Sequence, residues 1–345
     1  MPFRDVNRYP SAHQWASAPA RPAWSAGLHD AARWSDPRGL GPSGLAPRRK
    51  QPPGRGWRRV VYRATFGAVN LGRSPGELRE AALEARVRAP LRRRYKIGVL
   101  GKGGVGKTTV AASVGSLFAE LLQDDRVVAI DADTAFGKLG ARIDPSHVCS
   151  YWDLVDDPHL DRFADVRRWL GTNAAGLFVL PGEASGAARP RVLDPAIYRE
   201  AASHLDRHFL ISIIDCGSTL NSPVTEEVLV DLDALIVVSS LWVDAVSAAG
   251  QILEWLANRG LTRLLARTVV VLNDSDGYAD QQTRAALVEQ FKSRGQVVIE
   301  VPFDAHLRPG GVIAGSLDLG AATRRCFLQV AAAITDHFSS TAVRA

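Results

Sequence analysis

The sequence predicts an α/β fold: a doubly wound, mostly parallel sheet of about seven strands flanked by helices. Short apolar runs rich in Val, Ile and Leu alternate with helical patterns from residue 95 onwards. Such runs are typical of strands buried on both faces, and their alternation with helices favours parallel crossovers. The polar motifs follow the ends of these strands, where sheets of this class bind ligands.

The expected strands span residues 96–100, 126–131, 177–180, 209–214, 234–239, 267–272 and 297–301. The expected helices span residues 107–122, 195–206, 222–231, 244–259, 279–293 and 319–338. These elements fall within one domain, which we place at 95–345.

A basic extension precedes this domain. Residues 1–94 contain 19 Lys and Arg against 6 Asp and Glu, whereas the remaining residues contain 23 against 30. Residues 1–56 are rich in Pro, Ala and Arg and are predicted to be a disordered tail. Such an extension binds nucleic acid, acidic lipid or an acidic protein face, or serves only as a solubilising tail. The sequence leaves these alternatives open.

Residues 57–94 are predicted to form a small basic helical module. An amphipathic helix begins at Trp57, with three arginines away from its apolar side. A second helix begins after Ser74, because Pro75 suits the first helical position and Glu77 completes a capping box. Pro90 ends it.

A phosphate-binding loop lies between the first strand and the first helix of the domain. Its residues, Gly101 to Thr109, match the pattern Gly-x-x-x-x-Gly-Lys-Thr. Glycines let the backbone turn its N–H groups towards phosphate oxygens, and the helix N-terminus favours negative charge. Lys107 reaches the β- and γ-phosphates, and the Thr108 hydroxyl can ligate Mg²⁺. The expected nucleotide-binding residues are Gly103, Gly104, Val105, Gly106, Lys107, Thr108 and Thr109.

A second lysine, Lys102, narrows the interpretation. The run Lys-Gly-Gly-x-Gly-Lys-Thr-Thr resembles the "deviant" P-loop of the MinD/ParA ATPases, and the resemblance covers roughly residues 95–340. It implies a P-loop NTPase fold, ATP and Mg²⁺ as cofactors, and ATP hydrolysis. It also implies an ATP-dependent homodimer that sandwiches two ATP molecules, in which Lys102 and Lys107 act as catalytic residues and Lys102 reaches the nucleotide of the other subunit.

Three carboxylates complete the expected catalytic and metal site. Asp131 and Asp133 end the second strand, and alternation along an extended chain sends both to the same side. By the resemblance, Asp133 orients the attacking water and Asp131 lies near the Mg²⁺ shell; a capping pair is the alternative. Asp215 ends an apolar strand in the Walker B manner and should hold Mg²⁺. Gly217 follows it in a switch segment that lacks the prolines frequent in the family.

The adenine side is expected at two later strand ends. Asn273 offers a donor and an acceptor to a base edge, although a turn role is the alternative. Pro302 and Asp304 belong to a segment that resembles the family's Ile-Pro-x-Asp, which packs against adenine. Ser239, Ser240 and Asp244 are expected to line the dimer face or to cap the next helix, and capping is the favoured role of Asp244. Gly310 and Gly311 suggest a mobile loop.

The composition argues against several other classes. Three widely spaced cysteines, with no CxxC and no His/Cys cluster, argue against a zinc site, a disulfide framework or a shared iron–sulfur cluster, and favour a cytoplasmic location. No apolar run is long enough to span a membrane, and the last helix lacks the basic amphipathic character of a membrane-targeting helix.

The expected function is an ATP-dependent homodimeric switch that recruits a protein partner through the basic N-terminal region. A basic extension before a MinD-like body is similar to the EspI-like ATPases of actinobacterial type VII (ESX) secretion. One alternative is a ParA-like protein that binds DNA non-specifically. A second is a small-molecule phosphotransferase, although no acceptor pocket is evident in the sequence.

Overall fold

The structure, a computed structural model, describes residues 51–133, 137–182 and 191–339. The chain divides into two compact units, Met1–Arg73 and Ser74–Ala345. The expected disordered tail, residues 1–56, lies outside the described residues except for its last six.

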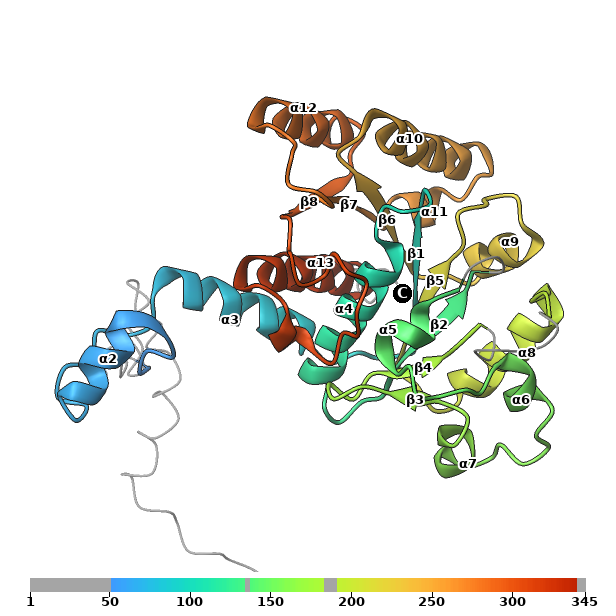
Figure 1. Cartoon of the computed structure of the whole chain (residues 1–345), viewed down its shortest axis with the longest axis horizontal. Helices are drawn as coiled ribbons and strands as arrows, with labels where there is room; N and C mark the ends of the chain where they lie inside the picture. Colours follow the sequence, from blue (N-terminus) through green and yellow to red (C-terminus); the bar gives the residue numbers. More distant parts are fainter. Residues whose placement is uncertain (1–50, 134–136, 183–190, 340–345) are drawn as a thin grey trace, which may run out of the picture. The chain divides into compact units, whose positions relative to one another are not determined.

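The second unit is built on one eight-stranded sheet, seven strands of which correspond to the expected ones (Figure 1). The strand order is β3-β4-β2-β5-β1-β6-β7-β8, and every pair is parallel except β3 with β4. The strands are β1 (Tyr95–Gly101), β2 (Val127–Ala132), β3 (Gly171–Thr172), β4 (Phe178–Leu180), β5 (Ile211–Cys216), β6 (Ala234–Ser240), β7 (Thr268–Asn273) and β8 (Val297–Val301). The sequence missed β3 because two residues carry no periodicity.

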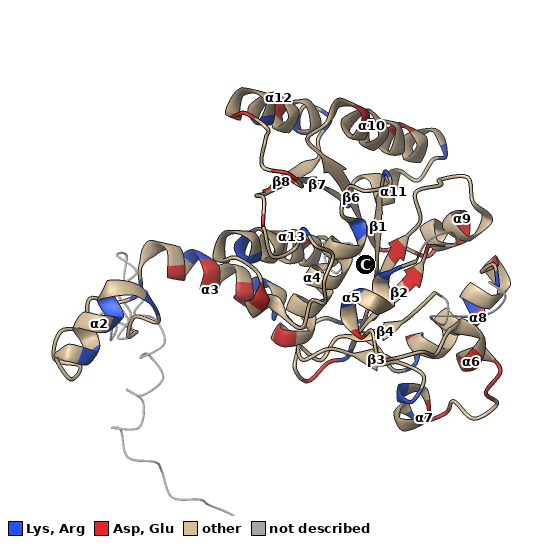
Figure 2. Cartoon of the chain, in the orientation of Figure 1, with Lys and Arg blue, Asp and Glu red and all other residues tan. Residues whose placement is uncertain are grey.

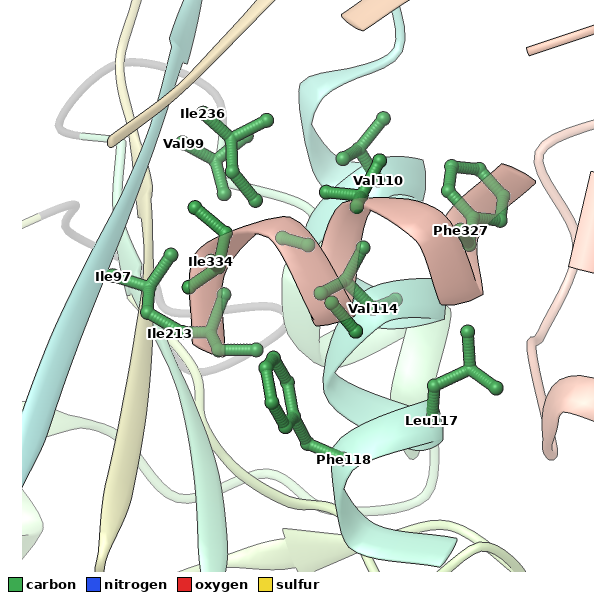
Figure 3. Packing of buried hydrophobic residues seen from close by; sticks show 14 of the residues in the cluster. Ile97, Val99, Val110, Val114, Leu117, Phe118, Ile213, Ile236, Phe327 and Ile334 are labelled. Atoms are coloured by element: carbon green, nitrogen blue, oxygen red, sulfur yellow. The ribbon is translucent and has the colours of Figure 1, made fainter. Parts of the chain in front are cut away.

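One face of the sheet is covered by α4 (Lys107–Leu121) and α13 (Ala321–Ser339). Figure 3 shows Ile97 and Val99 of β1 facing Val110 of α4 and Ile334 of α13. All four side chains are fully buried. This packing fixes the start of α4, and therefore the loop before it, against the end of β1.

The other face is covered by α8 (Pro195–Asp206), α9 (Pro223–Val230), α10 (Val243–Asn258) and α12 (Gln281–Lys292). Leu100 and Ile214, which alternate with the residues of the first face, pack on this side. Two separate buried clusters on opposite faces make the sheet doubly wound, as expected.

Short helices occupy connections in which the sequence shows no clear helical pattern. They are α5 (Leu139–Ile143), α6 (Tyr151–Val155), α7 (Phe163–Arg167), α11 (Thr262–Leu265) and the 3₁₀ turn η2 (Ser316–Asp318). One or two turns are too short to show a helical period. Among the described residues, none of the helices combines the length and apolar character needed to cross a membrane.

The structure divides residues 57–94 between its two units, whereas the sequence grouped them in one basic helical module. The division between the units falls between Arg73 and Ser74, so α3 (Pro75–Val87) belongs with the sheet and packs on α13. Val87 is fully buried in the core, and Arg324 of α13 pairs with Glu80. The expected capping box of α3 is confirmed, with Ser74 N 2.7 Å from the Glu77 carboxylate. Grouping by charge failed because α3 buries its apolar side and leaves its arginines outside.

In the first unit, α2 (Gly56–Ala64) confirms the expected amphipathic helix. Trp57 and Val60 share one side and are each 66% exposed, whereas Arg58, Arg59 and Arg63 point elsewhere. Figure 2 shows the basic residues of α2 in blue. No residue of α2 is buried.

Candidate functional site

The P-loop joins β1 to α4, as the sequence predicts. Gly106 has a left-handed φ of 96° and is the N-cap residue of α4. Gly101 lies so close to β6 that a Cβ on it would be 2.2 Å from the Val238 carbonyl oxygen. A Cβ on Gly103 or Gly104 would meet no atom within 4 Å. The loop is therefore fixed at its base and open on its outer side, where backbone N–H groups can meet phosphates.

The two lysines of the loop have different environments. Lys107 is 8% exposed, and its Nζ lies 3.3 Å from the carbonyl oxygen of Lys102. Lys102 is more exposed, and its ammonium donates a hydrogen bond to the carboxylate of Asp244 in the first turn of α10. That bond holds the pKa of Asp244 below its usual value. Asp244 was predicted to cap the helix, but Trp242 is the N-cap residue, and Asp244 instead pairs with Lys102.

Asp215 and Thr108 form the most suitable place for a magnesium ion. Asp215 ends β5, is 1% exposed, and accepts a hydrogen bond from the Thr108 side chain. Its Oδ1 is buried and has no hydrogen-bond partner in the described part of the chain. Burial raises the pKa of Asp215 to about 6, against the effects of Thr108 and Lys107. A buried carboxylate oxygen without a partner, beside a hydroxyl, fits Mg²⁺ chemistry.

No group of three or more His, Cys, Asp or Glu within the described ranges could hold a metal ion by itself. Mg²⁺ commonly uses one or two protein ligands and completes its shell with phosphate oxygens and water. Thr108 and Asp215 fit that mode of binding.

Asp131 lies beside Asp215, because the two residues are in register between β2 and β5. Its carboxylate accepts the backbone N–H of Leu139 at 2.9 Å and that of Asp133 at 3.2 Å. Burial and the neighbouring Asp215 raise the pKa of Asp131 to about 8. A Cβ on Gly137 would be 2.6 Å from this carboxylate. Asp131 therefore holds the backbone at Asp133 and Leu139, and its place near the metal shell remains an expectation.

Asp133 lies close to the segment after β5. A Cβ added to Gly217 would be 3.3 Å from its Oδ1. The start of the segment after β2 and the expected switch segment after Asp215 therefore approach each other at this carboxylate. Cys216, the last residue of β5, is 1% exposed. Burial raises the pKa of its thiol, which agrees with a packing role.

A cavity of about 380 Å³ lies beside the P-loop and is lined by Gly104, Gly106 and Thr108 among others. Its walls include Thr109 and the three residues expected on the adenine side, Asn273, Pro302 and Asp304. Asn273 donates from Nδ2 to the Val105 carbonyl oxygen at 2.9 Å, so it also braces the P-loop. Asp304 accepts the N–H of Gly320 at 2.8 Å and so helps to start α13.

Sequence reasoning did not assign several residues of this cavity to the site, among them Lys138, Arg142, Phe303 and Arg308. Lys138 precedes α5 and Arg142 lies within it, and neither belongs to a motif; the fold brings both to the cavity that Thr109 lines. Gly310 and Gly311, expected to form a mobile loop, belong to a segment that Arg142 contacts through the Gly311 carbonyl oxygen.

Comparisons with known proteins agree with this geometry. EspI, an ESX-1 secretion-associated protein of Mycobacterium tuberculosis, is 36% identical over 289 residues, which are 82% of this chain but 42% of that protein. The chain thus spans about two fifths of the length of this relative.

Two solved structures share the fold at lower identity. A ParA family ATPase from Chlorobium tepidum is 19% identical, with 73% of this chain and 100% of that chain covered and a TM-score of 0.52. MinD of Pyrococcus horikoshii, solved with Mg-ADP, is also 19% identical, with 69% and 94% covered and a TM-score of 0.51.

The family signature of the CobQ/CobB/MinD/ParA nucleotide binding domain matches residues 98–309. These residues contain the P-loop, the carboxylates Asp131, Asp133 and Asp215, and most of the cavity beside Thr109. The chain therefore belongs to the CobQ/CobB/MinD/ParA family of nucleotide-binding proteins.

Proposed function

We propose that this protein is an ATPase that works as an ATP-dependent homodimeric switch. The observation that carries the proposal is the position of Lys102. Its ammonium lies on the surface beside the P-loop and is paired with Asp244, whereas Lys107 occupies the inner side of the same loop. A lysine held on the surface by an exposed ion pair can exchange that carboxylate for the phosphates of a second subunit.

The residues of the chain divide the work as follows. The P-loop backbone and Lys107 bind the phosphates. Mg²⁺, when bound by Thr108 and Asp215, would neutralise charge on the β- and γ-phosphates. Asp133 would orient the attacking water, and Lys102 would stabilise charge across the dimer interface. Asp244 would release Lys102 when the dimer forms.

The output of such a switch is the binding of a partner. The similarity to EspI supports a role in type VII secretion, with recruitment through the basic N-terminal region. Because the chain spans about two fifths of EspI, that role and its partner are proposals for this protein.

Light scattering tests the switch. The D133A variant, which should bind but not hydrolyse ATP, is measured with and without ATP·Mg²⁺. We expect its mass to double only with the nucleotide, and the D133A/K102A double variant to stay monomeric. A D133A protein that is monomeric in both conditions would refute the dimer switch and would favour a phosphotransferase.

Non-specific DNA binding is the second candidate, and the excess of basic residues in 1–94 supports it. Titration of duplex DNA onto the full chain and onto a chain beginning at Ser74 separates the two cases. If residues 1–73 of the basic extension bind DNA, only the full chain binds, with affinity falling about a decade per decade of salt for each phosphate contact. Equal affinity of both chains would exclude residues 1–73 as the binding element.

A further inference from the structure

Arg142 of α5 is a buried cation, 6% exposed. Its Nη2 donates to the Thr109 hydroxyl at 2.7 Å, and its Nη1 donates to the Gly311 carbonyl oxygen. No salt bridge of Arg142 with an acidic side chain is present among the described residues. Burial without an opposite charge lowers the pKa of its guanidinium. Arginine in such a place is costly unless an anion neutralises it.

Among the described residues that line its cavity, neither of the two carboxylates is paired with Arg142. Of the two acidic residues in its walls, Asp274 is paired with Arg284, and Asp304 accepts the N–H groups of His306 and Gly320. Lys138 and Arg308 add two further cations to the walls. The cavity therefore has a net positive charge and is suited to an anionic ligand.

Arg142 also connects two parts of the site. Its side chain reaches Thr109 in the first turn of α4, and its backbone oxygen accepts the N–H of Ile313 at 2.8 Å. The segment 307–313 forms one wall of the cavity through Leu307 and Gly310. An anion bound by Arg142 would thus contact a residue that holds both the P-loop helix and this wall.

We propose that Arg142 binds a nucleotide phosphate at the Thr109 end of the P-loop and supplies the cation that this phosphate needs. The class of ligand is a nucleoside phosphate, and the phosphate is the counter-charge of the buried guanidinium. The inference rests on the proposed function in one respect, that nucleotide binds in this cavity. It does not depend on dimerisation.

Calorimetry of ADP and of adenosine tests it, using the full chain. R142Q should raise the ADP dissociation constant at least tenfold, because a charged hydrogen bond to phosphate is lost. Its affinity for adenosine should change less than twofold. R199Q, which removes one positive charge from a surface pair with Glu227, should leave both affinities unchanged. R142M, whose unbranched side chain fills the space of the buried methylene groups of Arg142, gives the same comparison if R142Q does not fold.

Each alternative result has a distinct meaning. ADP affinity unchanged in R142Q, or an equal loss for ADP and adenosine, would overturn the phosphate assignment and leave Arg142 as a packing residue. Absence of ADP binding in the parent protein would overturn this inference and the proposed function together. ADP binding without dimer formation in the D133A protein would refute only the switch.

Discussion

Gly106 provides a sharp test of how the P-loop is held. It has φ of 96°, and a Cβ added to it would be 2.6 Å from Nδ2 of Asn273. That nitrogen donates to the Val105 carbonyl oxygen at 2.9 Å. G106A therefore forces a left-handed alanine and also displaces the side chain that braces the loop.

The expected cost has two parts. A left-handed alanine costs roughly 1–2 kcal/mol, and the lost hydrogen bond costs about 1 kcal/mol more. The total of about 2–3 kcal/mol corresponds to a fall in melting temperature on the order of 5–10 °C for a domain of this size.

Gly176 is the matched control. Its φ is 82°, and a Cβ on it would meet no atom within 4 Å. G176A should therefore cost only the backbone term, with a fall on the order of 2–5 °C in the melting temperature. Thermal unfolding followed by circular dichroism compares the two variants.

The reasoning also requires that the extra cost of G106A depend on Asn273. In an N273A background, G106A should cost no more than G176A costs in the parent chain. Equal shifts of G106A and G176A in the parent chain, or an extra cost of G106A that survives in N273A, would refute the proposed contact.

Three further outcomes are expected. First, the ligand-free protein should lose stability as the pH rises from about 5 to about 8: raised pKa values of Asp215 (about 6) and Asp131 (about 8) mean that the fold disfavours their charged forms. The melting temperature should therefore fall as the pH rises, and it should fall less steeply in D131N. If the melting temperature of the parent protein falls no more steeply than that of D131N, the raised pKa of Asp131 is contradicted. Second, D244N should lower the dissociation constant of the ATP-dependent dimer about two- to fivefold, as measured by sedimentation. The exposed ion pair with Asp244 contributes little to the stability of the monomer, but it keeps Lys102 from the second subunit. A weaker dimer would instead place Asp244 at the interface. Third, a chain beginning at Ser74 should melt within a few degrees of the full chain, whereas a chain that also lacks α3 should melt at a much lower temperature, because α3 contributes to the core. Equal melting temperatures of the two shortened chains would support a separate module at residues 57–94.

The sequence by itself determined the fold class and the position of the P-loop between the first strand and helix of the domain. The P-loop is contiguous, its glycines are required by local backbone geometry, and its place between a strand and a helix is visible in hydrophobic periodicity. The sequence also indicated that Asp131 and Asp215 lie together, since each ends an apolar strand and parallel strands end at the same edge of the sheet. Local rules also found the capping box of α3, because its residues are three apart.

Tertiary structure alone decided which distant residues complete the site. Arg142 meets Thr109 across 33 positions, and Lys102 meets Asp244 across 142. No local sequence pattern reveals either pair, because each contact forms only where the crossover connections bring separate loops to the same edge of the sheet. The position of α3 was decided in the same way: its charge suggests a basic module, but its apolar side finds the core beside α13. Periodicity records which side of an element is buried, whereas the partner that buries it depends on the whole fold.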